Sequence, residues 1–199
     1  MFVYKKHMLL NKDFKGASYR LANNWLHHLS LDEFMYRPIN YLEIGVFYGG
    51  NAISVANTYA FHDKSKLYCI DPWEDYEDYP EYKERQPEIY DAFMHNIEAT
   101  MEREKFEVLR GYSNKIVPTL PDDFFDIIYI DGNHEPEYVL EDAVHCFRKL
   151  RKNGFMIFDD YGWGGPELTQ KGVDAFLKAY SKRIEYIGEK ESQVFVKKL

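Results

Sequence analysis

Three aspartates that follow two apolar runs are the clearest chemical feature of the sequence. Asp131 follows Phe-Phe-Asp-Ile-Ile-Tyr-Ile, and Asp159 and Asp160 follow Phe-Met-Ile-Phe. Such runs are typical of buried parallel strands, and neighbouring strands end about 5 Å apart. Carboxylates that close repel one another unless a cation binds, and an all-oxygen set favours Mg²⁺ over Zn²⁺. The sequence predicts that these three aspartates hold Mg²⁺ or another hard divalent cation, the alternative being that Asp159 or Asp160 only caps a loop.

His134 lies three residues after Asp131 and just before Pro136, where a helix is expected to begin. The positive end of a helix disfavours the charged imidazolium, so His134 should be neutral near pH 7 and able to accept a proton. His134 and Asp131 are therefore the candidate catalytic residues. A purely structural histidine is the alternative.

Glu43, Gly45 and Gly49 occur in the stretch Glu-Ile-Gly-Val-Phe-Tyr-Gly-Gly, where a strand is expected to turn into a helix. The glycines allow a ligand to approach the backbone closely, but their spacing differs from the Gly-x-Gly-x-x-Gly of dinucleotide-binding turns. A carboxylate in this position suits a ligand with a positive group better than one with phosphates. The alternative is that Glu43 only bonds to neighbouring protein groups.

Asp71 and Ser113 follow the next two expected strands. An acid at the end of a second strand commonly receives both hydroxyls of a ribose, and Ser113 is placed to reach an adenine edge or to cap a short helix. Together with Glu43 and the glycines, they indicate an adenosine that carries an amino acid instead of a phosphate chain.

The hydrophobic periodicity predicts how these residues are positioned. Strands that alternate with helices predict a Rossmann-like α/β three-layer sandwich with a mostly parallel seven-stranded sheet and an antiparallel C-terminal strand. Ligands bind such sheets beyond the carboxyl ends of the strands. The expected strands are residues 40–45, 66–71, 106–111, 124–132, 155–160, 183–188 and 193–199, with helices between them and a helical extension over 1–38.

Length and composition limit the possible functions. The 199 residues suit one domain over 1–199, and the 45% hydrophobic content supports a packed core. The net charge of −8 argues against binding to nucleic acid or to an anionic membrane. Two distant cysteines form no disulfide framework, and no apolar stretch is long enough to span a membrane. We expect a soluble cytoplasmic protein whose ligand is a small neutral or cationic molecule.

Residues 72–88 differ in composition from the rest of the chain. They contain seven acids, three Tyr, three Pro and one Trp. A solvated loop is the simpler interpretation, and an inserted lid over the site is the functional one, because long loops in compact domains often serve a function. Trp73 in this segment, and Tyr161 and Trp163 after the last aspartates, are candidates to stack on an acceptor ring.

The motifs Glu-Ile-Gly-Val-Phe-Tyr-Gly-Gly, Cys-Ile-Asp, Tyr-Ile-Asp-Gly-Asn-His and Phe-Asp-Asp-Tyr, in this order, resemble a class I S-adenosylmethionine-dependent methyltransferase. Within that class, the chain is similar to the metal-dependent macrocin and mycinamicin type, which methylates sugar hydroxyls. The resemblance spans roughly residues 40 to 199. Some relatives have an acid where this chain has Asn133, so an aspartate base is not available here.

The resemblance implies a role for each motif residue. Glu43, Gly45 and Gly49 would hold the methionine end of S-adenosylmethionine, Asp71 the ribose and Ser113 the adenine side, with Asp131 at the edge of the cofactor site. His134 would be the general base beside a Mg²⁺ held by Asp131, Asp159 and Asp160. The implied reaction is methylation of a hydroxyl on a sugar or glycoconjugate, for instance a deoxyhexose such as rhamnose.

Two other functions remain open at this point. A catechol or another small vicinal diol would bind Mg²⁺ as well as a sugar does, and a non-catalytic cofactor-binding module would need no acceptor. The glycine spacing disfavours a nicotinamide-dependent oxidoreductase. The acceptor and the oligomeric state do not follow from the sequence.

Overall fold

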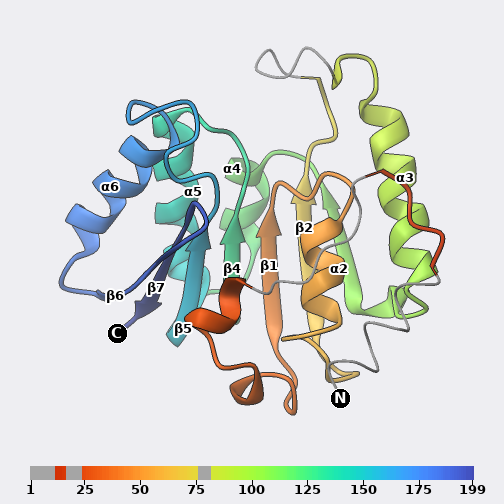
Figure 1. The fold of residues 1–199 in the computed structure, drawn as a ribbon, viewed down its shortest axis with the longest axis horizontal. Coiled ribbons are helices and arrows are strands. Elements are labelled where there is room, and N and C mark those ends of the chain that lie inside the picture. Colours follow the sequence, from red (N-terminus) through yellow and green to blue (C-terminus); the bar gives the residue numbers. More distant parts are fainter. Residues whose placement is uncertain (1–11, 17–23, 76–81) are drawn as a thin grey trace.

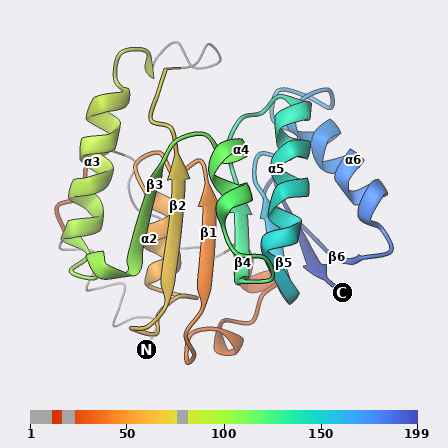
Figure 2. The ribbon, with the colours of Figure 1, turned by 180° about the vertical axis from the view of Figure 1, so that it is seen from behind.

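The computed structural model describes residues 12–16, 24–75 and 82–199. Its centre is a seven-stranded sheet with helices on both faces (Figures 1 and 2). The strands are β1 (Asn40–Ile44), β2 (Lys66–Asp71), β3 (Phe106–Arg110), β4 (Phe125–Ile130), β5 (Leu150–Phe158), β6 (Ile184–Lys190) and β7 (Gln193–Lys198). The helices are α2 (Gly50–Ala56), α3 (Gln86–Ala99), α4 (Ser113–Ile116), α5 (Pro136–Lys149) and α6 (Thr169–Tyr180).

The strand order is β3-β2-β1-β4-β5-β7-β6. The first five strands pair in parallel, and β7 runs antiparallel to both β5 and β6 (Figure 1). The predicted Rossmann-like sandwich is therefore confirmed. The order reverses at β1, which lies between β2 and β4, so the carboxyl ends of these strands border the crevice where such sheets bind ligands.

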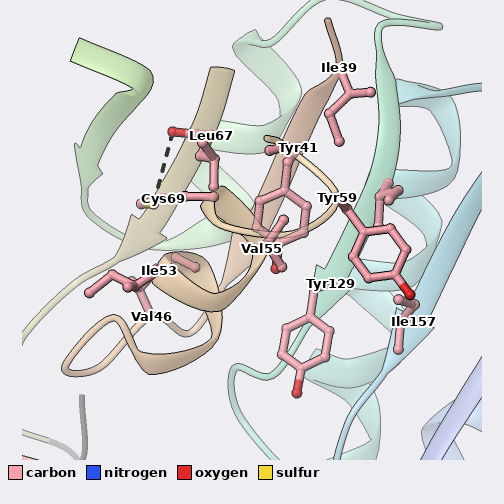
Figure 3. Packing of buried hydrophobic residues seen from close by; sticks show 14 of the residues in the cluster. Ile39, Tyr41, Val46, Ile53, Val55, Tyr59, Leu67, Cys69, Tyr129 and Ile157 are labelled. Carbon is pink, nitrogen blue, oxygen red and sulfur yellow. Dashed lines mark hydrogen bonds between the residues drawn. The ribbon is translucent and has the colours of Figure 1, made fainter. Parts of the chain in front are cut away.

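Alternate residues of each strand face opposite layers of the core, as the pleat requires. Tyr41 of β1 packs with α2, α3 and the segment that carries Trp25, whereas Leu42 packs with α5 and α6 on the other face. Figure 3 shows Tyr41, Tyr129 and Ile157 on the sheet face that Val55 of α2 covers. Both faces are covered, which explains why β4 is buried at every position.

The expected helical extension over 1–38 lies partly outside the described residues. Its described part holds two short 3₁₀ helices, Asn24–His27 and Leu31–Glu33. Trp25 is fully buried there, and its indole N–H donates to Gln193 of β7 over 3.1 Å. The described part of this segment is thus packed against the sheet. No helix in the described ranges is long and apolar enough to cross a membrane.

Candidate methyl-transfer site

A cavity of about 610 Å³ opens at the carboxyl ends of the parallel strands. Residues that follow β1, β2, β3, β4 and β5 all contribute to its wall. The strand ends are held in register, because the Asp131 N–H donates to Ile44 over 2.9 Å and the Asp159 N–H donates to Ile130 over 3.0 Å. Of the acids expected at the strand ends, Asp71 and Asp131 line this cavity, together with Asp160, whereas Glu43 and Asp159 are not among its lining residues.

Gly45 brings the turn after β1 into contact with the loop after β4. Its φ of +79° lies in the left-handed region, and a Cβ there would come 1.7 Å from the carbonyl oxygen of Asp131. Gly49 also has a positive φ, but it lies against Phe93 of α3 and is not part of the cavity wall. Gly45 therefore borders the ligand space, whereas Gly49 is the N-cap residue of α2 and lies outside the cavity wall.

Asp71 lies on the cavity wall and organises the turn after β1. Its carboxylate accepts hydrogen bonds from the N–H groups of Val46 and Phe47, both over 2.9 Å, and from Trp73 over 2.7 Å. Burial raises the pKa of Asp71, and these backbone donors partly oppose that rise. These hydrogen bonds fix the orientation of Asp71 on the cavity wall, and its contact with a ribose stays a prediction.

Glu43 is not among the residues that line the cavity, and its role at the methionine end stays a prediction. Its side chain is 1% exposed and accepts hydrogen bonds from the Tyr41 hydroxyl over 2.5 Å and from the Asn51 amide over 3.1 Å. Residues of β1 alternate between faces, so Glu43 points with Tyr41 toward α2. Burial raises the pKa of Glu43 from 4.5 to about 8.

This buried carboxyl group predicts an unusual dependence of stability on pH. Between pH 4.5 and about 8, Glu43 stays protonated in the folded chain but ionises on unfolding, so folding loses up to about 1.4 kcal/mol per pH unit as the pH rises. Glu43→Gln removes this loss, and its free energy of unfolding should decline less than that of the wild type between pH 5 and 8. Urea unfolding across that range measures the difference. Parallel curves for the two proteins would contradict the prediction.

Ser113 is the first residue of α4 and lies on the cavity wall. Its hydroxyl donates to Asp142 of α5, an acid that the sequence interpretation missed. Asp142 is 4% exposed and also lines the cavity. The sequence pattern could have identified Asp142. It lies among Val139, Ala143 and Cys146, on the apolar face of an amphipathic helix where a charge is unexpected.

Asp131, His134 and Asp160 come together at the end of the cavity nearest β5. One ligand atom from each lies within 4.8 Å of the others. The His134 Nε2 is 3.0 Å from Asp160 Oδ2, and the imidazole packs against Trp163 with ring centroids 4.5 Å apart. This cluster could hold a cation through two carboxylates and one imidazole.

Asp159 is not part of this cluster, so of the three aspartates expected to hold a cation the structure brings only Asp131 and Asp160 together with His134. Its carboxylate accepts a hydrogen bond from the Tyr129 hydroxyl, and Gln193 also bonds to it. Successive residues after a strand point in different directions, so Asp159 faces the buried layer and Asp160 faces the cavity. Asp160 also has a φ of +53°, which turns its side chain toward His134.

The three aromatic candidates have different environments. Trp73 is 1% exposed, with its ring stacked on Phe93 and its N–H donating to Phe47 over 3.1 Å. It is therefore a core residue, and the expectation that it stacks on an acceptor is corrected. Tyr161 donates to Asp174 over 2.9 Å, whereas Trp163 is 41% exposed beside His134.

The segment 72–88, considered as a lid, lies partly outside the described residues. Glu74, Tyr82 and Gln86, which flank residues 76–81, all line the cavity. Gln86–Glu88 form the first turn of α3 and are therefore not loop. Tyr112 follows β3, and its hydroxyl donates to Glu74 over 2.8 Å. This hydrogen bond links two walls of the cavity.

Residues 42–161 match the family described as "Methyltransferase domain". The chain belongs to this family. It is accordingly the class I S-adenosylmethionine-dependent methyltransferase that its motifs resemble, and the matched range contains the cavity-lining ends of all five parallel strands.

Solved structures share the fold of this methyltransferase at low identity. The O-methyltransferase TomG from Streptomyces achromogenes, solved with SAM, has a TM-score of 0.65 at 17% identity, covering 100% of this chain and 88% of TomG. The O-methyltransferase NovP has a TM-score of 0.62 at 17% identity, covering 88% and 75%. MycE of mycinamycin biosynthesis, solved with Mg and SAH, has a TM-score of 0.59 at 16% identity, covering 88% of this chain and 49% of MycE.

A curated relative by sequence is the uncharacterized protein R132 of Acanthamoeba polyphaga mimivirus. It is 24% identical over 166 residues, which cover 81% of this methyltransferase and 68% of R132.

Proposed function

We propose that this protein transfers the methyl group of S-adenosylmethionine to a hydroxyl of a sugar or glycoconjugate and that the transfer requires Mg²⁺. The observation that carries the proposal is the Asp131, His134 and Asp160 cluster on the wall of the cavity. MycE, which shares the fold, has been solved with Mg, SAH and mycinamycin VI. The same fold with an acidic cluster at the cavity supports a related reaction here.

The cavity wall offers groups that suit each part of the cofactor. Asp71 has about one of its four acceptor sites left for a ribose hydroxyl, because its three backbone donors occupy the other three. In this proposal Gly45 permits close approach of the methionine end, and Ser113, which also lines the cavity, would lie beside the adenine. Glu43 and Gly49 lie outside the cavity wall. Glu43 accepts a hydrogen bond from Asn51 of α2, and Gly49 lies against Phe93 of α3.

The residues of the cluster fit a hard divalent cation. Asp131 and Asp160 supply carboxylate oxygens at the cavity, and such oxygens with water or substrate oxygens complete the octahedron that Mg²⁺ prefers. We assign Asp131 and Asp160 as the protein ligands, with Asp159 supporting them from the buried side. When bound, the ion would lower the pKa of an acceptor hydroxyl and fix its direction.

His134 is the residue we assign as general base. Mg²⁺ prefers oxygen ligands, so the imidazole beside the two aspartates is better suited to take the proton from the acceptor hydroxyl. The Trp163 ring packs against the imidazole and limits its access to water. The sulfonium methyl is already activated, so the remaining task of the protein is to align oxygen, carbon and sulfur.

The charge of the cavity favours an acceptor without phosphate or carboxylate groups. Six carboxyl groups line it, against Lys115 as the one lysine or arginine among its described residues. An anionic acceptor would be repelled, whereas a neutral sugar could pack a ring face on the exposed part of Trp163. Tyr161 supports this loop through its bond to Asp174.

Transfer of labelled methyl from S-adenosylmethionine to a panel of deoxyhexosides, other glycosides and catechols tests the proposal. We expect label on a glycoside with Mg²⁺ and none with EDTA. Metal-dependent label on catechols alone would show the vicinal-diol function. Cofactor binding with no transfer to any acceptor class would favour a non-catalytic binding module, and full activity in EDTA would exclude the role of the metal.

A further inference from the structure

The turn between β1 and α2 contains a residue in an unusual backbone conformation. Phe47 lines the cavity, and its φ of +53° lies in the left-handed region that residues other than glycine rarely adopt. The turn is closed by the Gly49 N–H, which donates to the Val46 carbonyl over 2.8 Å. A strained residue of this kind persists only where surrounding contacts enforce its conformation. The side chains that bond to this turn therefore shape one wall of the cavity.

Side chains from outside the turn bond to its backbone. Asp71 accepts hydrogen bonds from two N–H groups of the turn, one of which belongs to Phe47. The Trp73 indole N–H donates to the Phe47 carbonyl over 3.1 Å. The side-chain amide of Asn96, in α3, donates to the Tyr48 carbonyl over 2.9 Å. Asp71 lies on the cavity wall, whereas Trp73 and Asn96 are buried and do not line the cavity.

Asn96 also ties the described N-terminal residues to this turn. Its side chain is 0% exposed; its amide donates to the Lys15 carbonyl over 3.0 Å, and its oxygen accepts from the Lys15 N–H over 2.7 Å. Residues 12–16 therefore run beside α3 (Figure 1). Both amide protons of Asn96 are used, one on Lys15 and one on Tyr48. Because a buried backbone group without a partner is costly, loss of this amide should loosen both segments.

We infer that Asn96, together with Trp73, is a positioning residue for cofactor binding that acts through the turn after β1 on Asp71. The hydrogen bonds from Asn96 and Trp73 hold Phe47 in the left-handed conformation, in which its N–H reaches the Asp71 carboxylate. When they are lost, the turn relaxes and Asp71 loses a donor that fixes its orientation. Neither residue lines the cavity, so each acts on a ligand only through the turn. The inference rests on the proposed placement of S-adenosylmethionine beside Asp71.

Calorimetric binding of S-adenosylhomocysteine tests the inference. We expect Asn96→Ala to weaken binding by about tenfold, which corresponds to one lost hydrogen bond. Trp73→Phe keeps an aromatic ring but removes the N–H donor to Phe47, and we expect it to weaken binding by about threefold. Circular dichroism at the assay temperature checks that each variant is folded, because lower stability alone does not change the affinity of a fully folded protein. Trp73→Phe tests the same turn if Asn96→Ala does not fold.

A double-mutant cycle with Asp71→Ala identifies the route of the effect. If Asn96 acts through Asp71, then Asn96→Ala should weaken binding by less than about twofold once the carboxylate is absent, because interacting residues give non-additive effects. A residue that only stabilises α3 would not produce this coupling in the affinity.

Thr100→Val is the matched control, since it removes a buried side-chain hydrogen bond to the Ile97 carbonyl at the end of the same helix. Its affinity for S-adenosylhomocysteine should equal that of the wild type. Wild-type affinity in the folded Asn96 and Trp73 variants, or equal weakening in Thr100→Val, would overturn the inference. Additive effects of Asn96→Ala and Asp71→Ala would overturn it as well. If the wild type does not bind S-adenosylhomocysteine, the proposed function itself fails.

Discussion

Asp160→Asn is expected to lower kcat by about a thousandfold or more while the fold stays intact. Asp160 contributes a charged oxygen to the cluster with Asp131 and His134, and an amide is a much weaker ligand for Mg²⁺. The substitution suits the backbone, because Asn tolerates the φ of +53° at this position. The side chain of Asp160 is 37% exposed, so little packing is lost.

Two measurements separate the loss of the metal from damage to the fold. Titration with Mn²⁺, followed by electron paramagnetic resonance, should show binding to the wild type and none to Asp160→Asn. Thermal unfolding should be the same for both proteins. Glu167→Gln, which removes an exposed acid paired with Lys171 in the same loop, should keep both activity and Mn²⁺ binding. Retained turnover in Asp160→Asn would contradict the assignment of the cluster.

Gly45→Ala is expected to lower the free energy of unfolding by about 3 to 5 kcal/mol. The added methyl group would overlap the carbonyl of Asp131, and Ala would have to adopt a φ of +79°. Relief of the overlap would separate the β1 turn from the β4 loop, so cofactor binding should fall as well. Urea unfolding and calorimetry with S-adenosylhomocysteine measure the two effects.

Gly162→Ala separates backbone strain from steric overlap. Gly162 has a φ of +89°, but a Cβ there would meet nothing within 4 Å. We expect a loss of about 1 kcal/mol from the left-handed conformation alone. Equal losses in the two variants would mean that the contact between Gly45 and Asp131 does not constrain the site.

The sequence was sufficient to predict the sheet and the position of its strand-end acids. Period-two alternation and continuous apolar runs define buried strands, and parallel strands place their carboxyl ends at one edge. Asp71 and Asp131 line the cavity at the strand ends, whereas Glu43 and Asp159, which the same reasoning placed there, do not. Strand ends therefore predict which edge of the sheet holds the acids but not which of them face the cavity.

Side-chain direction within the site could not be predicted in the same way. Asp159 and Asp160 are adjacent, and the choice between them depends on the backbone turn at Asp160 and on the hydroxyl of Tyr129 in β4, a strand distant in sequence. Trp73 lies in a polar segment, yet Phe93 of α3 covers its ring. Such contacts are tertiary and leave no local pattern.

The insertion of β7 between β5 and β6 has a consequence for how the chain folds. Strand β7 is the last of the seven in the chain, yet it covers the edge of β5 along Phe155–Phe158. Until residues 193–198 pair, that apolar edge presents free N–H and C=O groups, which are a template for strands of other chains. Any folding intermediate in which this edge is open would therefore be prone to aggregate, and its closure depends on the pairing of β7 with β5.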